Sequence, residues 1–179
     1  MSARNKTLVI VESPAKCQKI ESYLGEEYKC IASFGHLRTL TNLKDIDTKN
    51  KYKATYSMIA KNKQYPKLKK CIEECKDVLL ATDDDREGEA IAWHICCIFS
   101  LPVATTKRII FHEITKTAIC NAVISPTILN MNIVQAQQTR QILDMLVGFR
   151  ISPILWKNIS WNSKSGLSAG RCQSPALRL

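Results

Sequence analysis

Two short apolar runs, each leading into a helical pattern, constrain the fold of this chain more than any other feature. The first run covers residues 7–11 (TLVIV) and precedes a helical pattern at residues 15–24. The second lies within residues 77–82 and precedes a helical pattern at residues 87–99. A short apolar run without polar alternation is typical of a strand buried on both faces of a parallel sheet. The pattern therefore predicts an α/β fold.

Further elements continue this alternation of strands and helices. The expected strands are residues 28–33 and 107–112, and the expected helices are residues 64–75 and 115–124. Strands that alternate with helices form an open parallel sheet with flanking helices. A long amphipathic pattern then covers residues 132–149, and Gly148 and Pro153 are expected to break or kink it. We therefore predict an α/β domain at residues 1–130 and the beginning of a mainly helical domain at residues 131–179.

The second apolar run ends in a dense cluster of acidic residues. Five acids and one arginine lie between Asp83 and Glu89. Asp83 and Asp85 project from one face if the strand conformation continues, and Glu87 follows at the same spacing. Such a cluster repels itself unless a cation binds, and carboxylate oxygens suit Mg²⁺. The alternative is a solvated acidic loop that favours the start of a helix. The position at the carboxyl end of a parallel strand, where α/β sheets bind ligands, favours a metal site.

Two charged residues follow the first strand in the same way. Glu12 lies at the carboxyl end of that strand, and Ser13 and Pro14 suit the N-cap and the first turn of the next helix. Lys16 falls in that first turn, where a positive charge is unfavourable for the helix dipole. An anion such as phosphate bound there would explain the lysine. A surface lysine is the alternative, and the residue alone does not decide between them.

The distribution of charge indicates a polyanionic partner. The chain of 179 residues has a net charge of +10, and because residues 83–89 carry −4 (five acids, one arginine), the remainder carries +14. A basic body around one acidic spot suggests a polyanion that is handled with a divalent ion. Residues 44–70 hold nine lysines and two acids, with Tyr52, Tyr56 and Tyr65 among them. This stretch is either a surface that faces nucleic acid or a solvated loop and helix face.

Cysteine usage and hydropathy indicate the cellular compartment. The eight cysteines are scattered, with Cys96 and Cys97 adjacent in a helical pattern, and they show no paired CxxC or histidine spacing. We interpret all eight as reduced residues, mostly in packing roles, of an intracellular protein. The N-terminus has no apolar signal region, and no run approaches transmembrane length. We expect a protein of the cytoplasm, nucleoid or nucleus, not a secreted one, with no membrane partner.

Six blocks of sequence, in a fixed order, are characteristic of one family. They are LVIVESPAK (8–16), SFGHLRTL (33–40), ATDDDREGEAIAWHI (81–95), RIIFHEIT (108–115), QQTRQILDMLVGFRISPILW (137–156) and GLSAGRCQSPALRL (166–179). Together they resemble, nearly from end to end of the chain, the N-terminal part of type IA DNA topoisomerases. The acidic motif alone would also fit primases and nucleases of the same Toprim fold. The resemblance implies a Toprim (Rossmann-like) domain followed by the start of a DNA-groove domain.

The resemblance also implies a reaction. In this family a tyrosine attacks a phosphodiester of single-stranded DNA and becomes linked to the 5′ phosphate. Another strand passes, and the break is resealed without ATP. By resemblance Asp83, Asp85 and Glu87 would hold Mg²⁺. Glu12 would be a further metal ligand or an acid/base group for the leaving 3′ hydroxyl, and Lys16 would contact the scissile phosphate.

Other positions match parts of the family that contact DNA. Arg140, Asp144, Arg171 and Gln173 match contact positions, since arginine donors suit the DNA backbone. Arg140 and Asp144 are four residues apart, so an intrahelical surface pair is the alternative. His36 and Arg38 match a block near the site, and a turn-stabilising role is their alternative. The implied substrate is single-stranded segments of supercoiled or catenated duplex DNA.

The chain departs from the family in three respects. An apolar residue is usual where Asp84 stands, and valine is usual where Cys172 stands. We do not count Asp84 as a ligand, and we interpret Cys172 as a packing substitution. In the family the nucleophilic tyrosine lies beyond the last block, whereas the five tyrosines here all precede the acidic motif.

The missing tyrosine leads to a further expectation. We expect a truncated or partial chain that acts as a monomer with the rest of its own polypeptide and is inactive in strand cleavage alone. Another Toprim enzyme, such as a primase or nuclease, and a non-catalytic DNA-binding remnant remain alternatives.

Overall fold

The computed structural model describes residues 5–59, 63–159 and 166–178. The chain divides into two compact units, Met1–Thr39 with Met58–Gln135 and Leu40–Ser57 with Ala136–Leu179. The two-residue strands β3 (Arg38–Thr39) and β6 (Ser57–Met58) stand where the chain passes from one unit to the other. The domain limits drawn from sequence, residues 1–130 and 131–179, remain a prediction. Leu179, the last residue of the sixth block, lies outside the described residues.

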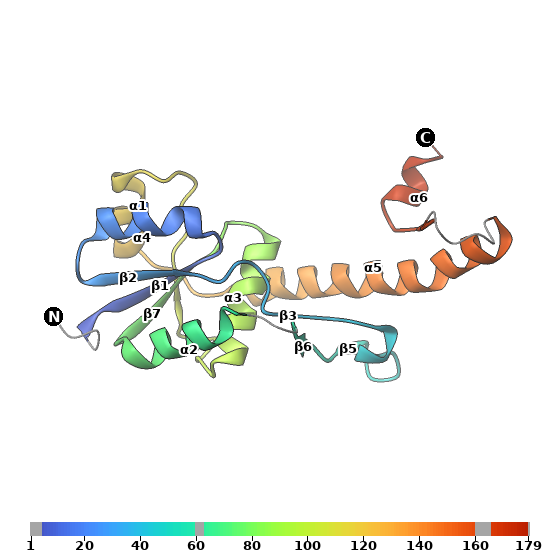
Figure 1. Cartoon of the computed structure of the whole chain (residues 1–179), viewed down its shortest axis with the longest axis horizontal. Helices are drawn as coiled ribbons and strands as arrows, with labels where there is room; N and C mark the ends of the chain where they lie inside the picture. Colours follow the sequence, from blue (N-terminus) through green and yellow to red (C-terminus); the bar gives the residue numbers. More distant parts are fainter. Residues whose placement is uncertain (1–4, 60–62, 160–165, 179) are drawn as a thin grey trace. The chain divides into compact units, whose positions relative to one another are not determined.

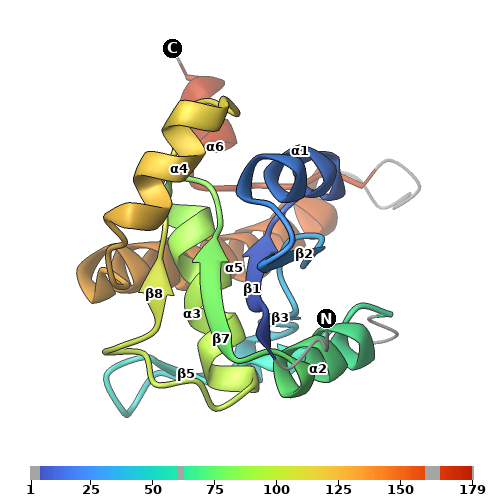
Figure 2. The same cartoon turned by 90° about the vertical axis from the view of Figure 1, so that its left-hand side faces the viewer.

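A parallel sheet of four strands forms the centre of the first unit. The strands are β1 (Thr7–Val11), β2 (Tyr28–Ala32), β7 (Asp77–Ala81) and β8 (Lys107–Arg108), in the order β2-β1-β7-β8. Figure 1 labels β1, β2 and β7, and Figure 2 shows β8 beside β7. All three pairings are parallel, and Val11 of β1 lies opposite Ala32 of β2 and Ala81 of β7. The predicted open parallel sheet is confirmed. Because its strands run the same way, all their carboxyl ends meet at one edge.

Helices cover both faces of this sheet. Leu8 and Ile10 of β1 pack with α2 (Tyr65–Glu74) and α3 (Arg86–Ile98) on one face. Val9 and Val11 pack with α1 (Pro14–Leu24) and α4 (Lys116–Ile124) on the other. Figure 2 shows the two pairs of helices on opposite sides of the strands. This alternation explains why the strand had to be apolar at every position.

The predicted signals at the helix ends are confirmed. Helix α1 starts after Ser13 with Pro14 in its first turn, and it ends at Gly25, whose φ of 82° suits glycine. Helix α4 is capped by Thr115, whose Oγ1 accepts the backbone N–H of Ala118 at 3.3 Å. Helix α3 begins one residue earlier than expected, because Asp85 acts as its N-cap.

Strand β8 is shorter than the strand predicted at residues 107–112. Only two residues pair with β7, although Ile109 N–H still donates to Leu80 O at 2.8 Å. The backbone of Arg108 exchanges hydrogen bonds of 2.8 and 2.7 Å with Thr127. Beyond Ile109, Phe111 and Ile114 pack into the core cluster beneath α1 and α4 without continuing the ladder. Apolar burial therefore extends further along this segment than strand pairing does.

The second unit contains short elements and most of one long helix. They are the 3₁₀ turn η2 (Leu43–Asp45), strands β4 (Ile46–Asp47) and β5 (Lys53–Ala54), and helices α5 (Met131–Asn158) and α6 (Gln173–Ala176). Helix α5 begins in the first unit and continues through Gly148 and Pro153, so a break there is wrong, and the alternative of a kink stays a prediction. At this point Ser152 Oγ accepts the N–H of Ala169 at 3.0 Å. Ser152 and Ala169 are both buried, so this tertiary contact lies next to Pro153, which removes a backbone donor from the helix.

No helix in the described part of the chain is long and apolar enough to span a membrane.

Candidate active site at the carboxyl edge of the sheet

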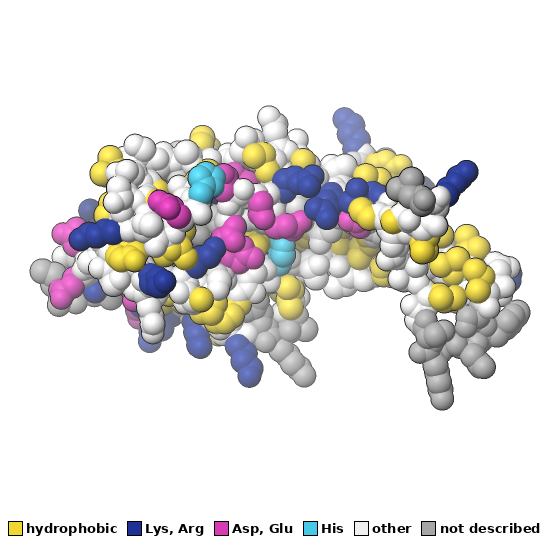
Figure 3. Space-filling view, turned by 90° about the horizontal axis from the view of Figure 1, so that it is seen from above, with side chains coloured by type: hydrophobic (Ala, Val, Ile, Leu, Met, Phe, Trp, Pro, Cys, Tyr) yellow, Lys and Arg dark blue, Asp and Glu magenta, His cyan; other side chains and the backbone are white. Residues whose placement is uncertain are grey.

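The end of each central strand carries an acidic residue into the same loop region. Glu12 directly follows β1, and Asp83 follows β7 after the buried residue Thr82. Because Val11 and Ala81 are register partners, the two loops leave the sheet side by side. Figure 3 shows acidic side chains gathered on one face, with lysine, arginine and histidine side chains near them. The predicted convergence of strand ends is therefore present.

Lys16 and His36 partner two of the carboxylates. Lys16, in the first turn of α1, forms an ion pair with the carboxylate of Asp83. His36 Nε2 lies 3.2 Å from Glu87 Oε2. These contacts join the first, second and third sequence blocks. They also place the Lys16 ammonium among acidic groups, which explains a lysine at a helix start without any bound anion.

The pKa of the Glu12 carboxyl depends on burial and on the charges around it. Burial raises its pKa above the ordinary value, and the negative charges of Asp83 and Asp85 raise it further. Lys16 and His36 oppose this rise but do not cancel it. The pKa of Glu12 is therefore raised chiefly because the carboxyl is partly buried, with two neighbouring carboxylates acting in the same direction.

The loop from Asp83 to Gly88 is held by close backbone contacts. Asp85 Oδ1 accepts the N–H of Gly88 at 2.7 Å, so this carboxylate caps α3. A Cβ on Gly88 would lie 2.0 Å from Asp83 O, which only glycine avoids. From the other side, Arg108 Nη2 donates to the same Asp83 O at 2.8 Å. The capping role that we held as the alternative for the acidic cluster thus applies to Asp85.

A buried ion pair lies beneath this loop, and sequence reasoning did not identify it. Arg108 is fully buried, and its Nη1 lies 3.5 Å from Oε1 of the buried Glu89. Burial raises the pKa of Glu89, while Arg108 lowers it. A signal in the sequence is that each residue directly precedes an apolar run, residues 109–111 after Arg108 and residues 90–93 after Glu89, where a buried charge needs a partner.

His36 and Arg38 belong to an aromatic cluster beside the site. Arg38 Nε donates to Nδ1 of the buried His94, and its guanidinium lies 4.6 Å from the centre of the Trp93 ring. The His36 and His94 rings meet edge to face at 5.8 Å. Burial lowers the pKa of His94 to about 3, and the positive charges of Arg38 and His36 act in the same direction. These contacts join residues 36–38 to helix α3, and the turn-stabilising role that was the alternative for His36 and Arg38 stays a prediction.

The donor chemistry of this edge fits a hard divalent cation. Glu12, Asp83, Asp85 and Glu87 supply only carboxylate oxygens; burial raises the pKa of Glu12 most, and the neighbouring charges of Asp83 and Asp85, which a cation would offset, raise it further. In the arrangement described, no three acidic, histidine or cysteine side chains among the described residues lie close enough to hold a metal ion. Asp84, which was not counted as a ligand, has its carboxylate 3.7 Å from His112 Nε2.

The remaining predicted DNA contacts lie in the second unit. Asp144 Oδ1 accepts a hydrogen bond from Arg171 Nε at 2.8 Å, and Arg140 lies 3.8 Å from the same carboxylate. Gln173 Nε2 donates to Ser168 Oγ at 3.0 Å. All four predicted side chains are exposed. The intrahelical pair between Arg140 and Asp144 is present, and Arg171 joins it from 27 residues away.

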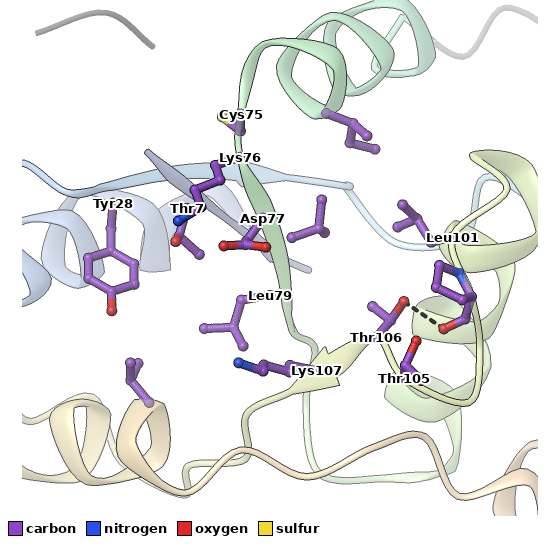
Figure 4. A pocket seen from close by; sticks show the side chains of 14 residues that line it. Thr7, Tyr28, Cys75, Lys76, Asp77, Leu79, Leu101, Thr105, Thr106 and Lys107 are labelled. Carbon is purple, nitrogen blue, oxygen red and sulfur yellow. Dashed lines mark hydrogen bonds between the residues drawn. The ribbon is translucent and has the colours of Figure 1, made fainter. Parts of the chain in front are cut away.

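A separate cavity lies at the opposite, amino-terminal ends of the strands. It measures about 400 Å³ and is lined by Thr7, Tyr28, Asp77, Lys107 and neighbouring residues (Figure 4). Within it, Thr106 Oγ1 donates to the backbone carbonyl of Pro102 at 2.8 Å. Since parallel sheets bind ligands at their carboxyl ends, this cavity is not the candidate active site.

Comparison with known proteins assigns this arrangement to a family. A Toprim domain model matches residues 7–114, and a DNA topoisomerase model matches residues 128–179. The chain belongs to the type IA DNA topoisomerases. Within that family it corresponds to the N-terminal region, and Toprim domains in general bind divalent metals.

A solved structure agrees with this assignment. The full-length topoisomerase I from Thermotoga maritima is 41% identical, with a TM-score of 0.85 over 96% of this chain. The match spans 29% of that topoisomerase, so this chain represents less than a third of its length.

Proposed function

We propose that this chain is the metal- and phosphate-binding part of a type IA DNA topoisomerase. The complete reaction would break single-stranded DNA through a 5′-phosphotyrosine link, pass a strand and rejoin the ends, with Mg²⁺ and without ATP. Its outcome would be a change in DNA topology, chiefly the relaxation of negative supercoils. A primase or nuclease of the Toprim fold would account for residues 7–114 but not for the second match at residues 128–179.

The observation that carries this proposal is the set of charges at the ends of β1 and β7. Glu12, Asp83, Asp85 and Glu87 would hold Mg²⁺, whose charge would stabilise the phosphate during transfer. Lys16 is paired with Asp83, so its ammonium is already held at this edge. When a phosphodiester enters, Lys16 Nζ would contact a non-bridging oxygen of the scissile phosphate and stabilise its growing negative charge.

Proton transfer would be the second task of this edge. The leaving 3′ oxygen needs a proton during cleavage, and the same oxygen must lose it during rejoining. Glu12 is the residue we propose for this role, as an alternative to direct metal ligation. Its backbone carbonyl accepts Phe34 N–H at 3.0 Å, which fixes the loop that carries it.

Binding of the DNA backbone would involve half-buried side chains in the first unit and exposed ones in the second. In the first unit, His36 contacts the carboxylate of Glu87, and Arg38 donates a hydrogen bond to His94. In the second, Asp144 orients the guanidinium of Arg171, and Gln173 and Arg140 lie along the same segments. Such a pair limits the orientations of the arginine and leaves other donors for phosphate.

The nucleophilic tyrosine is not among the residues proposed for this chain. Tyr23, Tyr28, Tyr52, Tyr56 and Tyr65 all precede the acidic motif, and none matches the family's nucleophile motif. Transesterification needs a phenol oxygen held in line with the phosphorus, which metal-binding carboxylates cannot replace. We therefore propose that residues 1–179 act with a tyrosine elsewhere in the same polypeptide, as a monomer.

Labelled single-stranded DNA tests this proposal. Residues 1–179 alone should neither relax supercoiled plasmid nor form a covalent adduct in a denaturing gel. A longer chain that carries the downstream tyrosine should do both, and Asp83→Ala with Asp85→Ala should abolish them. An adduct of the short chain, lost on changing Tyr52, Tyr56 or Tyr65 to Phe, would contradict the proposal. Inactivity of the longer chain would favour a non-catalytic DNA-binding remnant.

A further inference from the structure

A rigidly anchored hairpin in the second unit carries the middle of the lysine-rich stretch. Strands β4 and β5 pair antiparallel, with Ile46 opposite Ala54 and Asp47 opposite Lys53. Ile46 is buried, and Thr55 N–H donates to Asp45 O at 2.8 Å. The Asp45 carboxylate accepts the backbone N–H groups of residues 41 and 42 at 2.7 and 3.0 Å. The base of the hairpin is therefore fixed at several points.

The turn of this hairpin has an unusual choice of residues. Lys53 N–H donates to Asn50 O at 2.9 Å, and the central residues Lys51 and Tyr52 have φ values of 50° and 58°. Two consecutive positive φ values define a type I′ turn, whose central positions favour Asn and Gly. A lysine and a tyrosine there meet the steric penalty of the left-handed region. Strain of this kind is concentrated at functional positions.

The residues at the tip share a basic and aromatic character. All residues from 47 to 53 are exposed, including Lys49, Lys51 and Lys53, and Tyr52 is 53% exposed. The one acid among them, Asp47, accepts the backbone N–H groups of Lys49 and Asn50 at 3.1 and 3.2 Å. Its carboxylate is thus engaged in the turn, and the exposed residues of the tip include three lysines and one tyrosine.

We propose that this hairpin binds single-stranded DNA, with Tyr52 stacked on a base and the lysines on adjacent phosphates. Stacking on an aromatic side chain needs an unpaired base, and lysines spaced along a turn suit a flexible backbone. An acidic protein surface would match the lysines but would leave the solvent-exposed ring unexplained. The inference rests on the proposed DNA substrate, and it adds a binding surface that none of the family-matched positions includes.

Fluorescence anisotropy with a labelled oligothymidine of about 12 nucleotides tests this hairpin. Tyr52→Ala in the full chain should weaken binding by about 5- to 150-fold, the range that stacking on one base gives. Tyr52→Trp should bind at least as tightly as the wild type. Lys49→Ala and Lys51→Ala should each lower the log–log salt slope by roughly 0.7. Lys67→Ala on α2, an equal change of charge outside the hairpin, should leave the slope unchanged.

Tyr52→Gly separates binding from folding. Glycine adopts positive φ without a steric penalty, so this variant should melt no lower than the wild type while it loses the same affinity as Tyr52→Ala. Wild-type affinity in Tyr52→Gly would overturn the hairpin assignment and leave the proposed function standing. Absence of single-strand binding in the wild type would overturn both. Tighter binding to oligouridine than to oligothymidine would overturn the assignment to DNA.

Discussion

The carboxyl edge of the first unit and the Asp144–Arg171 cluster of the second unit are built in different ways. The carboxyl edge is supported by buried groups. Arg108 and Glu89 lie beneath the loop that carries Asp83, and Gly88 approaches the backbone of Asp83 closely. The second consists of exposed side chains on α5 and on the segment after residue 166. A reacting phosphate requires placement within about 1 Å, whereas backbone contacts tolerate movement. Under the proposed function, the deeply packed region would position a reacting phosphate and the exposed cluster would contact the DNA backbone, so packing depth would follow the accuracy that each task needs.

The largest expected effect is on stability, when a glycine in each region is replaced by alanine. Gly88→Ala places Cβ 2.0 Å from Asp83 O and should destabilise the fold by on the order of 3 kcal/mol or more. Gly148→Ala is the matched control, because its Cβ would meet only Ala169 O at 3.8 Å. Inside helix α5 this change should stabilise by about 0.5–1 kcal/mol. Urea denaturation measures both, and equal effects would remove the contrast.

The second effect concerns acid stability, to which the buried His94 of the first unit contributes. The pKa of His94 falls from 6.5 unfolded to about 3 folded, so its contribution is complete above pH 6.5 and is lost as pH falls towards 3. The loss should reach about 2 kcal/mol at pH 5. His94→Gln should therefore lose less stability than the wild type between pH 7 and 5, as measured by urea midpoints at each pH.

Two other groups with shifted pKa values contribute equally to the stability of wild type and variant. Glu12 and Glu89 have raised pKa values, so they stabilise the fold as pH falls, and they do so in both proteins. Their contribution cancels when wild type and variant are compared. Parallel pH profiles for the two proteins would show that His94 accepts a proton in the folded state without cost.

The smallest expected effect on stability belongs to the second unit. Arg171→Ala removes an exposed ion pair with Asp144, so the urea midpoint should be unchanged within error. Binding of single-stranded DNA should nevertheless weaken for all sequences, and the log–log salt slope should fall by roughly 0.7. An altered affinity with an unchanged slope would mean that Arg171 acts through packing.

Sequence patterns were sufficient for the first unit because its strands and caps are local. The apolar runs, Ser13 with Pro14, and Gly25 each act within a few residues, and all were confirmed. Strand β8 was overestimated because Phe111 and Ile114 are apolar for packing and not for pairing. The spacing of Asp83, Asp85 and Glu87 was interpreted as that of metal ligands, whereas Asp85 also caps α3.

The remaining features depend on contacts distant in sequence. Arg108 meets Glu89 and the Asp83 carbonyl only after β8 has docked beside β7. Arg171 meets Asp144 through an irregular segment that has no periodicity. Beside Pro153, α5 makes a hydrogen bond between Ser152 Oγ and the N–H of the distant Ala169, a contact that no helical pattern contains. Local propensity predicted a break there, and tertiary contacts override it.

The most direct test of the central claim measures the effect of Mg²⁺ on stability. Metal that binds only the folded state stabilises it, by about 1.4 kcal/mol at ten times the dissociation constant. Thermal melts of residues 1–179 should shift upward with Mg²⁺, and Asp83→Asn with Asp85→Asn should remove the shift. Asp84→Asn, a neighbouring acid paired with His112, should retain it. An equal shift in the wild type and the Asp83/Asp85 variant would contradict a metal site at the carboxyl edge.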